Sequence, residues 1–131
     1  MTGVDPLRAA EPLAGRRILI VEDEAMIALL IQDVLADLGS EVVGPATRID
    51  TALALAVAEP IDLAVLDLNL AGELVYPVAE ALAGRGIPFI FVTGDGQIGI
   101  AERWRDRPSL PKPFRPSQLA GALRATLDTG S

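Results

Sequence analysis

Short apolar runs rich in β-branched residues alternate along this chain with longer helix-forming segments. The runs end at charged or turn-forming residues, which is typical of strands buried on both faces of a sheet. They predict five strands, at 18–21, 41–43, 63–66, 89–92 and 109–110. The longer segments predict helices at 25–38, 49–58, 78–83 and 117–127, with a weaker helical pattern at 100–104. Gly39 is expected to end the first helix.

Each predicted strand is followed by a helical segment, as parallel strands require, because they need crossover connections. Right-handed crossovers favour helices on both faces. The predicted fold class is therefore α/β, a doubly wound, flavodoxin-like (βα)5 sheet of five parallel strands in the order 2-1-3-4-5. Residues 16–127 form the predicted domain. Residues 1–15, with their prolines and glycines, are predicted to be a flexible lead-in, and 128–131 a short tail.

Composition narrows the possible chemistry. The 131 residues carry a formal charge of −7, which makes nucleic acid an unexpected partner. The sequence has no histidine and no cysteine, which excludes imidazole-based triads, thiolate nucleophiles and disulfides. Its longest uncharged stretch is nine residues, against the roughly 20 apolar residues of a spanning helix. With no secretory leader pattern either, a cytoplasmic protein without membrane contact is expected.

Polar side chains gather where the predicted strands end. Glu22 and Asp23 follow the first strand, Asp67 the third, Thr93 the fourth and Lys112 the fifth. Three neighbouring carboxylates repel one another, and a hard divalent cation such as Mg²⁺ relieves that repulsion. The lysine ammonium and the threonine hydroxyl would then complete a pocket for a small oxyanion such as a phosphoryl group.

The ordered set Glu22-Asp23, Asp67, Thr93 and Lys112-Pro113-Phe114 resembles the receiver domain of bacterial two-component response regulators, from about Arg16 to Leu127. The resemblance implies that Asp67 accepts a phosphoryl group from a sensor histidine kinase. It implies that Thr93 and Lys112 contact the phosphoryl oxygens. Such a protein catalyses only its own phosphorylation and dephosphorylation, and signals through a downstream protein or phosphotransfer partner.

The same resemblance implies a Mg²⁺ site. Asp23, Asp67 and the backbone carbonyl of Asn69 would be ligands, and Glu22 would act mostly through bound water. Asn69 and Asp95 stand two positions after Asp67 and Thr93, where the resemblance places residues that flank the attacking water. We expect these two side chains to tune the lifetime of the phosphoryl group. The Lys112-Pro113 peptide bond is expected to be cis.

One position departs from most receivers. Ser109 stands three residues before the lysine, where most receivers carry an aromatic switch residue. The segment 88–94 resembles the motif of the FAT GUY subgroup, which lacks that aromatic, although Asp95-Gly96 continue it differently. Membership of the subgroup implies a partner kinase of the HWE or a related class.

Three alternatives stand beside a single-domain receiver. The first is a receiver excised from a hybrid kinase, which would show a longer native gene product. The segment Gly94–Gly99 spells G-x-G-x-x-G and could belong to a dinucleotide-binding domain, although that fingerprint usually follows the first strand. A degenerate receiver would act as a binding module without phosphorylation.

Overall fold

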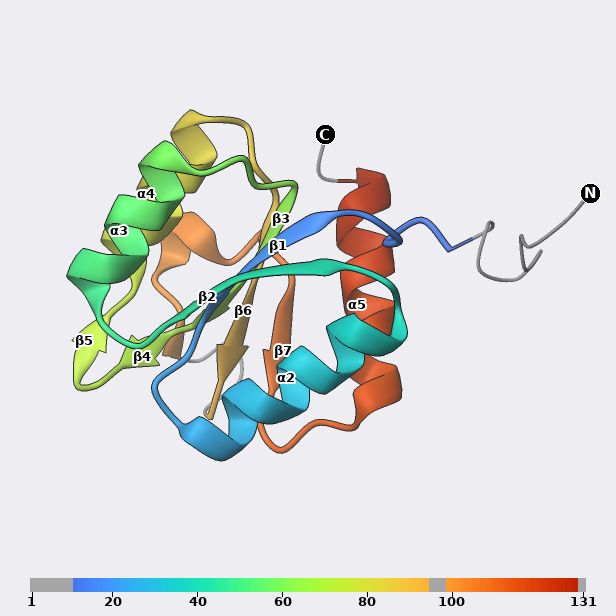
Figure 1. Ribbon diagram of the computed structural model, residues 1–131. Coiled ribbons are helices and arrows are strands. Elements are labelled where there is room, and N and C mark those ends of the chain that lie inside the picture. Colours follow the sequence, from blue (N-terminus) through green and yellow to red (C-terminus); the bar gives the residue numbers. More distant parts are fainter. Residues whose placement is uncertain (1–10, 95–98, 130–131) are drawn as a thin grey trace, which may run out of the picture.

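A computed structural model describes residues 11–94 and 99–129 of the chain. Five parallel strands form one sheet, in the order β2-β1-β3-β6-β7 (Figure 1). Their bounds are Arg17–Val21 for β1, Glu41–Ala46 for β2, Leu63–Asp67 for β3, Phe89–Thr93 for β6 and Ser109–Pro111 for β7. Counted along the sheet, these are the five predicted strands in the predicted order 2-1-3-4-5, so the doubly wound α/β fold is confirmed.

Helices cover both faces of the sheet (Figure 1). They are α2 (Ala25–Asp37), α3 (Ile49–Ala58), α4 (Tyr76–Gly84) and α5 (Pro116–Thr129), with a 3-10 turn, η2, at Glu102–Trp104. Helices α2 and α5 pack together on one face, whereas α3 and α4 pack together on the other. The predicted weak helix at 100–104 is thus the short turn η2.

Two hydrophobic cores lie on opposite faces of the sheet. Alternate strand residues point to each face, so that Leu19 and Phe91 pack under α3 and α4 while Ile20 and Ile90 pack under α2 and α5. All five residues of β3 are buried, as are all five of β6. Burial on both faces explains why these strands are almost continuously apolar.

Gly39 ends the first helix as predicted. Its φ of 77° is a left-handed conformation that glycine adopts without a steric penalty. The Gly39 N–H donates to the Ala36 carbonyl, and the Ser40 N–H donates to the Leu35 carbonyl. These bonds satisfy carbonyl groups that the end of the helix would otherwise leave unpaired, and they turn the chain into β2.

A β-bulge in the edge strand β2 positions the start of the site. The register shifts between Leu19 and Val21 on β1, opposite Gly44, whose φ is 95°. A Cβ atom at Gly44 would lie 2.9 Å from the Ile20 carbonyl oxygen, so the close approach requires glycine. Beyond the bulge, the Glu22 N–H donates to the Ala46 carbonyl at 3.0 Å. The edge strand therefore holds the backbone at Glu22.

A small hairpin after β3 is absent from the sequence prediction. Strands β4 (Asn69–Leu70) and β5 (Glu73–Leu74) pair antiparallel across a two-residue turn. Both turn residues have positive φ, 51° at Ala71 and 87° at Gly72. Strands of two residues carry no readable alternation, and alanine is an unusual residue for such a turn.

The predicted flexible lead-in is partly packed. Leu13 is fully buried against the core under α2 and α5. The Ser40 hydroxyl donates to the Leu13 carbonyl at 2.7 Å, and the Gly15 N–H donates to the Gly39 carbonyl at 2.8 Å. Residues 11–15 thus belong to the folded unit. The buried Leu13 side chain holds them there, and its contacts are with residues far along the chain. Residues 1–10 lie outside the described part of the chain.

Candidate functional site

The parallel strands bring the predicted site residues to one edge of the sheet. Glu22 follows β1, Asp67 ends β3 and Thr93 ends β6, and the parallel registers of these strands align their ends. Lys112 follows β7, and its backbone N–H donates to the Thr93 carbonyl at 2.8 Å. The Lys112-Pro113 peptide bond is cis, as predicted. All four positions therefore meet at the edge where the strands end.

The Lys112 ammonium lies among three carboxylates. Its Nζ atom is 3.4 Å from Glu22 Oε1, 3.4 Å from Asp67 Oδ1 and 3.2 Å from Glu24 Oε1. Glu22 and Asp67 are buried, whereas the Glu24 side chain is 60% exposed. Lys112 is the only lysine in the sequence. Among the described residues, one ammonium thus lies at ion-pair distance from three carboxylates and offsets only part of their negative charge.

Asp67 is buried among groups that oppose its ionisation. The residue is 4% exposed. Desolvation is the main cause that raises its pKa, to about 7, and the nearby Glu22 carboxylate adds to the increase. Asp23 also raises the pKa of Asp67, whereas the positive charge of Lys112 lowers it. The Asp67 carboxylate therefore requires more positive charge than Lys112 supplies.

The residues present fit a small hard cation. Carboxylate oxygens of Glu22, Glu24 and Asp67 all lie within 4.8 Å of one another. Glu22 Oε1 is a buried oxygen that lacks a hydrogen-bond partner among the described residues. A buried acceptor of this kind is normally satisfied, and oxygen donors are the ligands that Mg²⁺ prefers.

The carboxylates in this group differ in one member from the predicted metal ligands. Asp23 is exposed and does not belong to the group of three, although its side chain is near enough to Asp67 to raise its pKa. Glu24 takes a place in the group that the sequence did not assign to it. Its position directly after Glu22-Asp23 was the only signal available, since the direction of its side chain depends on how α2 begins.

A small pocket opens beside Asp67. Its volume is about 130 Å³, and Asn69, Leu74, Thr93 and Gly94 line it together with Asp67. Leu74 comes from the unpredicted hairpin and is 51% exposed, so sequence reasoning missed it as a wall of this pocket. The predicted tuning residue Asn69 lies at the pocket, whereas Asp95 falls outside the described residues. The space is of the size that a small oxyanion needs.

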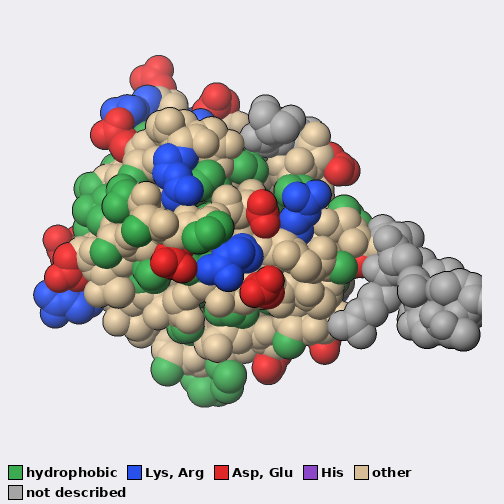
Figure 2. Space-filling model, turned by 45° about the horizontal axis from the view of Figure 1, so that its top comes forward, with side chains coloured by type: hydrophobic (Ala, Val, Ile, Leu, Met, Phe, Trp, Pro, Cys, Tyr) green, Lys and Arg blue, Asp and Glu red, His purple; other side chains and the backbone are tan. Residues whose placement is uncertain are grey.

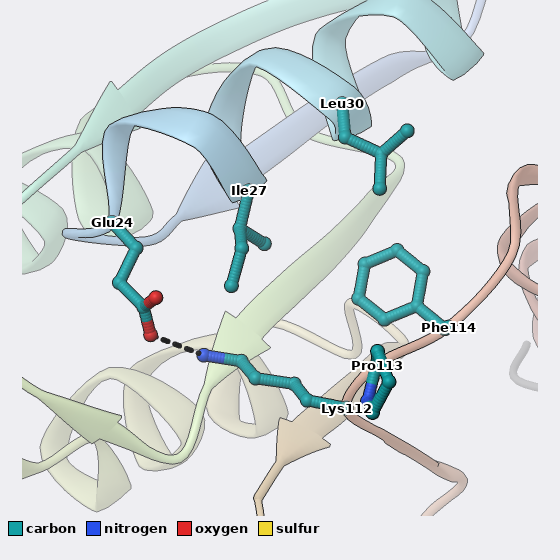
Figure 3. A pocket seen from close by; sticks show the side chains of 6 residues that line it. All are labelled: Glu24, Ile27, Leu30, Lys112, Pro113 and Phe114. Atoms are coloured by element: carbon teal, nitrogen blue, oxygen red, sulfur yellow. Dashed lines mark hydrogen bonds and ion pairs between the residues drawn. The ribbon is translucent and has the colours of Figure 1, made fainter.

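A second, apolar groove lies on the other side of Lys112. Ile27 and Leu30 of α2 face Phe114 across it, and its volume is about 330 Å³ (Figure 3). The Glu24–Lys112 ion pair lies at one end of the groove. The groove joins residues from α2 and from the segment after β7, which lie far apart in the sequence.

The position of the missing aromatic is occupied by Ser109, the half-buried first residue of β7. Aromatic rings instead pack around Trp104, which is stacked on Tyr76 at a centroid distance of 6.5 Å and lies edge-on to Phe91 at 6.4 Å. The Tyr76 hydroxyl accepts a hydrogen bond from the Ala101 N–H at 2.7 Å. The chain around η2 is thereby fastened to α4 and to β6, the strand that ends at Thr93.

Comparison with known proteins identifies related sequences. The family model for the response regulator receiver domain matches residues 18–124. The transcriptional regulatory protein PdtaR of Mycobacterium tuberculosis is 34% identical over 127 residues, which are 94% of this chain. The match spans 61% of the length of PdtaR.

Solved structures agree in fold. The solution structure of SdrG from Sphingomonas melonis Fr1 has 47% sequence identity and a TM-score of 0.78, covering 86% of this chain and 97% of that chain. The BeF3-activated conformation of SdrG from Pseudomonas melonis Fr1 has 47% identity and a TM-score of 0.74, covering 87% and 98% of the two chains. Within the described residues, none of the helices has the length and apolar character that crossing a membrane requires.

Proposed function

The chain belongs to the response regulator receiver domain family, and from that premise we propose that it accepts a phosphoryl group on Asp67 in a Mg²⁺-dependent reaction. The donor in this proposal is a phosphohistidine on a sensor histidine kinase of the HWE or a related class. An Asp67 oxygen forms a bond to phosphorus, and the bond from phosphorus to the histidine nitrogen breaks, with its electron pair passing to that nitrogen. Once Asp67 is ionised, which the positive charge of Lys112 favours, no proton has to be removed from the nucleophile, and this suits a chain without histidine.

The observation that carries this proposal is the contact between Asp67 and Lys112. Asp67 is 4% exposed, and its Oδ1 atom lies 3.4 Å from the Nζ atom of the only lysine in the chain. A buried carboxylate beside a fixed ammonium can receive a group that brings further negative charge, because the ammonium is already placed to offset it.

Each remaining residue has a separate task. Lys112 offers its ammonium to the phosphoryl oxygens, and the Thr93 hydroxyl donates a hydrogen bond to them. Asp23, Asp67 and the Asn69 carbonyl would hold Mg²⁺, with Glu22 acting through water; bound Mg²⁺ neutralises part of the charge on the transferring group. The pocket beside Asp67 and Asn69 supports this assignment by leaving room for an oxyanion. Asn69 and Asp95 would tune the lifetime of the phosphoryl group.

Signalling in this proposal takes place in the cytoplasm, as a change in affinity for a protein partner or as onward phosphotransfer. The protein catalyses only its own phosphorylation and dephosphorylation. The chain is 47% identical to SdrG, which has a solution structure in a BeF3-activated conformation. This similarity supports the proposal that the present chain responds to a phosphoryl-like group.

The test is incubation with acetyl phosphate, with Mg²⁺ or with a chelator, followed by mass analysis of the intact protein and its peptides. We expect one phosphoryl adduct on Asp67, formed only with Mg²⁺ and lost in Asp67→Asn. Asp62→Asn is the matched control, because Asp62 lies at the opposite edge of the sheet and should leave the adduct unchanged. An adduct that survives in Asp67→Asn, or that forms equally with chelator, would contradict the proposal.

A further inference from the structure

Glu24 contacts the Lys112 ammonium from outside the buried site. Its Oε1 atom accepts a hydrogen bond from Lys112 Nζ at 3.2 Å, across 88 residues of sequence (Figure 3). The other two carboxylates around this ammonium, Glu22 and Asp67, are buried. Glu24 is thus the one member of the group that faces solvent, with a side chain that is 60% exposed.

The Glu24 side chain is directed to this contact instead of to its own helix. Glu24 is the N-cap residue of α2, yet its carboxylate makes no capping hydrogen bond. The side chains that ordinarily cap a helix from this position are those of Ser, Thr, Asp and Asn, and the longer glutamate reaches Lys112 instead. The Glu24 backbone N–H donates to Glu22 Oε2 at 3.1 Å, which fixes the turn and leaves the Glu24 side chain toward Lys112.

The lysine contacts then compete with any new anion. An ammonium group has three N–H donors, and three carboxylates already lie 3.2–3.4 Å from it. Of these three contacts, the one to Glu24 is a hydrogen bond, whereas Glu22 and Asp67 lie at an ion-pair distance of 3.4 Å. A phosphoryl group on Asp67 would compete with all three carboxylates for the ammonium. Breaking the contact to Glu24 costs least, because water can replace the ammonium at an exposed carboxylate but not at a buried one.

We propose that Glu24 is a positioning residue for Lys112, which holds the ammonium at the rim of the site and releases it when a phosphoryl group arrives. The proposal rests on the proposed function of Asp67. In this role the Glu24 carboxylate stays with the Lys112 ammonium and is not a Mg²⁺ ligand, although its oxygens lie within 4.8 Å of those of Glu22 and Asp67. It sets how strongly Lys112 can bind the phosphoryl oxygens.

The test compares wild type with Glu24→Gln, which removes the charge but keeps the length of the side chain. Glu73→Gln is the matched control, because Glu73 is an exposed carboxylate of the hairpin that follows Asp67 and is not one of the three around Lys112. The first measurement needs no phosphorylation. Lys112 is the only lysine, so lysine-selective ¹⁵N labelling reports its ammonium alone, and the exchange of its protons with water can be followed by NMR.

The second measurement is the binding of beryllofluoride in saturating Mg²⁺, followed by the backbone amide signals of Thr93 and Lys112. In Glu24→Gln we expect ammonium protons to exchange at least about threefold faster and half-saturation at about threefold less beryllofluoride, as for loss of an exposed ion pair. Both values should stay at the wild-type level in Glu73→Gln.

Three outcomes would overturn the inference. Unchanged proton exchange in Glu24→Gln would mean that the contact does not hold the ammonium. Faster exchange with unchanged beryllofluoride binding would mean that the contact does not compete with the phosphoryl group. Weaker beryllofluoride binding would place Glu24 among the Mg²⁺ ligands. Failure of wild type itself to bind beryllofluoride would instead refute the proposed function, and the exchange measurement would still test the contact.

Discussion

The two edges of the sheet each place one basic residue among acidic side chains. Arg17 lies at the edge where the strands begin, and Lys112 lies at the edge where they end. Arg17 reaches Glu41 at 3.4 Å and Glu59 at 3.2 Å, and its backbone N–H donates to Asp62 at 2.9 Å. The guanidinium and both of these glutamates are substantially exposed, with side chains 32%, 62% and 42% exposed. The carboxylates around Lys112 include two that are buried.

The difference lies in burial and in the balance of charge. At the beginning of the strands a second arginine, Arg85, donates to the carbonyls of Ala56 and Glu59. Figure 2, which turns the upper edge of Figure 1 toward the viewer, shows basic and acidic side chains next to one another. Water screens such exposed ion pairs, so they contribute little to the free energy of unfolding. At the end of the strands, desolvation and then the neighbouring Glu22 carboxylate raise the pKa of Asp67, and the excess of negative charge favours binding of a cation.

The largest effect should come from removing the surplus charge. Asp67→Asn is expected to raise the free energy of unfolding at pH 8 in chelator by about 2–4 kcal/mol, since each pKa unit corresponds to about 1.4 kcal/mol. The pKa of Asp67 is raised from 3.8 to about 7 on folding, so the folded state pays for ionising it. This penalty is absent below pH 3.8, grows as the pH rises toward about 7 and is constant above that.

Urea unfolding of both proteins at several pH values would measure this gain. The difference between Asp67→Asn and wild type should disappear near the ordinary pKa of an aspartate. A variant that is less stable than wild type, or a gain that does not depend on pH, would contradict a raised pKa of Asp67 in the folded state.

Removing a carboxylate at the opposite edge should change the free energy of unfolding in the opposite direction. Asp62→Ala is expected to lower the free energy of unfolding by about 1–2 kcal/mol, because the partly buried Arg17 N–H loses its acceptor. Urea unfolding at pH 8 measures the loss, with Asp62→Asn, which retains an acceptor oxygen, as the control. Stabilisation by Asp62→Ala would mean that carboxylates are in surplus at both edges.

The smallest effect is expected at the exposed ion pair. Glu41→Gln should change the free energy of unfolding by less than about 0.5 kcal/mol, because its contact to Arg17 is 3.4 Å long and the Glu41 side chain is 62% exposed. Thermal or urea unfolding at low and at physiological salt would measure the change. A loss larger than that of Asp62→Ala would show that water does not screen this edge as its exposure implies.

Local sequence predicted most of the framework because its signals are local. An apolar run such as 63–66 is a buried strand in the structure, and Gly39 ends its helix through its positive φ. The hairpin after β3 escaped prediction because a strand of two residues has no period to read. Leu13 escaped because one apolar residue among helix and strand breakers gives no sign of the core that it enters.

In the candidate site, too, some features were predictable from the sequence and others were not. Asp67, Thr93 and Lys112 were predictable because parallel strands bring their ends to one edge, whatever the side chains do there. The partners of Lys112 were not. Glu24, rather than Asp23, contacts the ammonium, and the choice depends on the turn that the Glu22 carboxylate makes with the Glu24 N–H.

By itself, the sequence determined the order of strands and helices and the polar residues that end each strand, because periodicity and chain order are properties of neighbouring residues. Only the tertiary structure decided the depth at which each charge is buried and the carboxylates that share one ammonium. Those depend on contacts between residues as far apart as Glu22 and Lys112, and on how far each side chain lies from water.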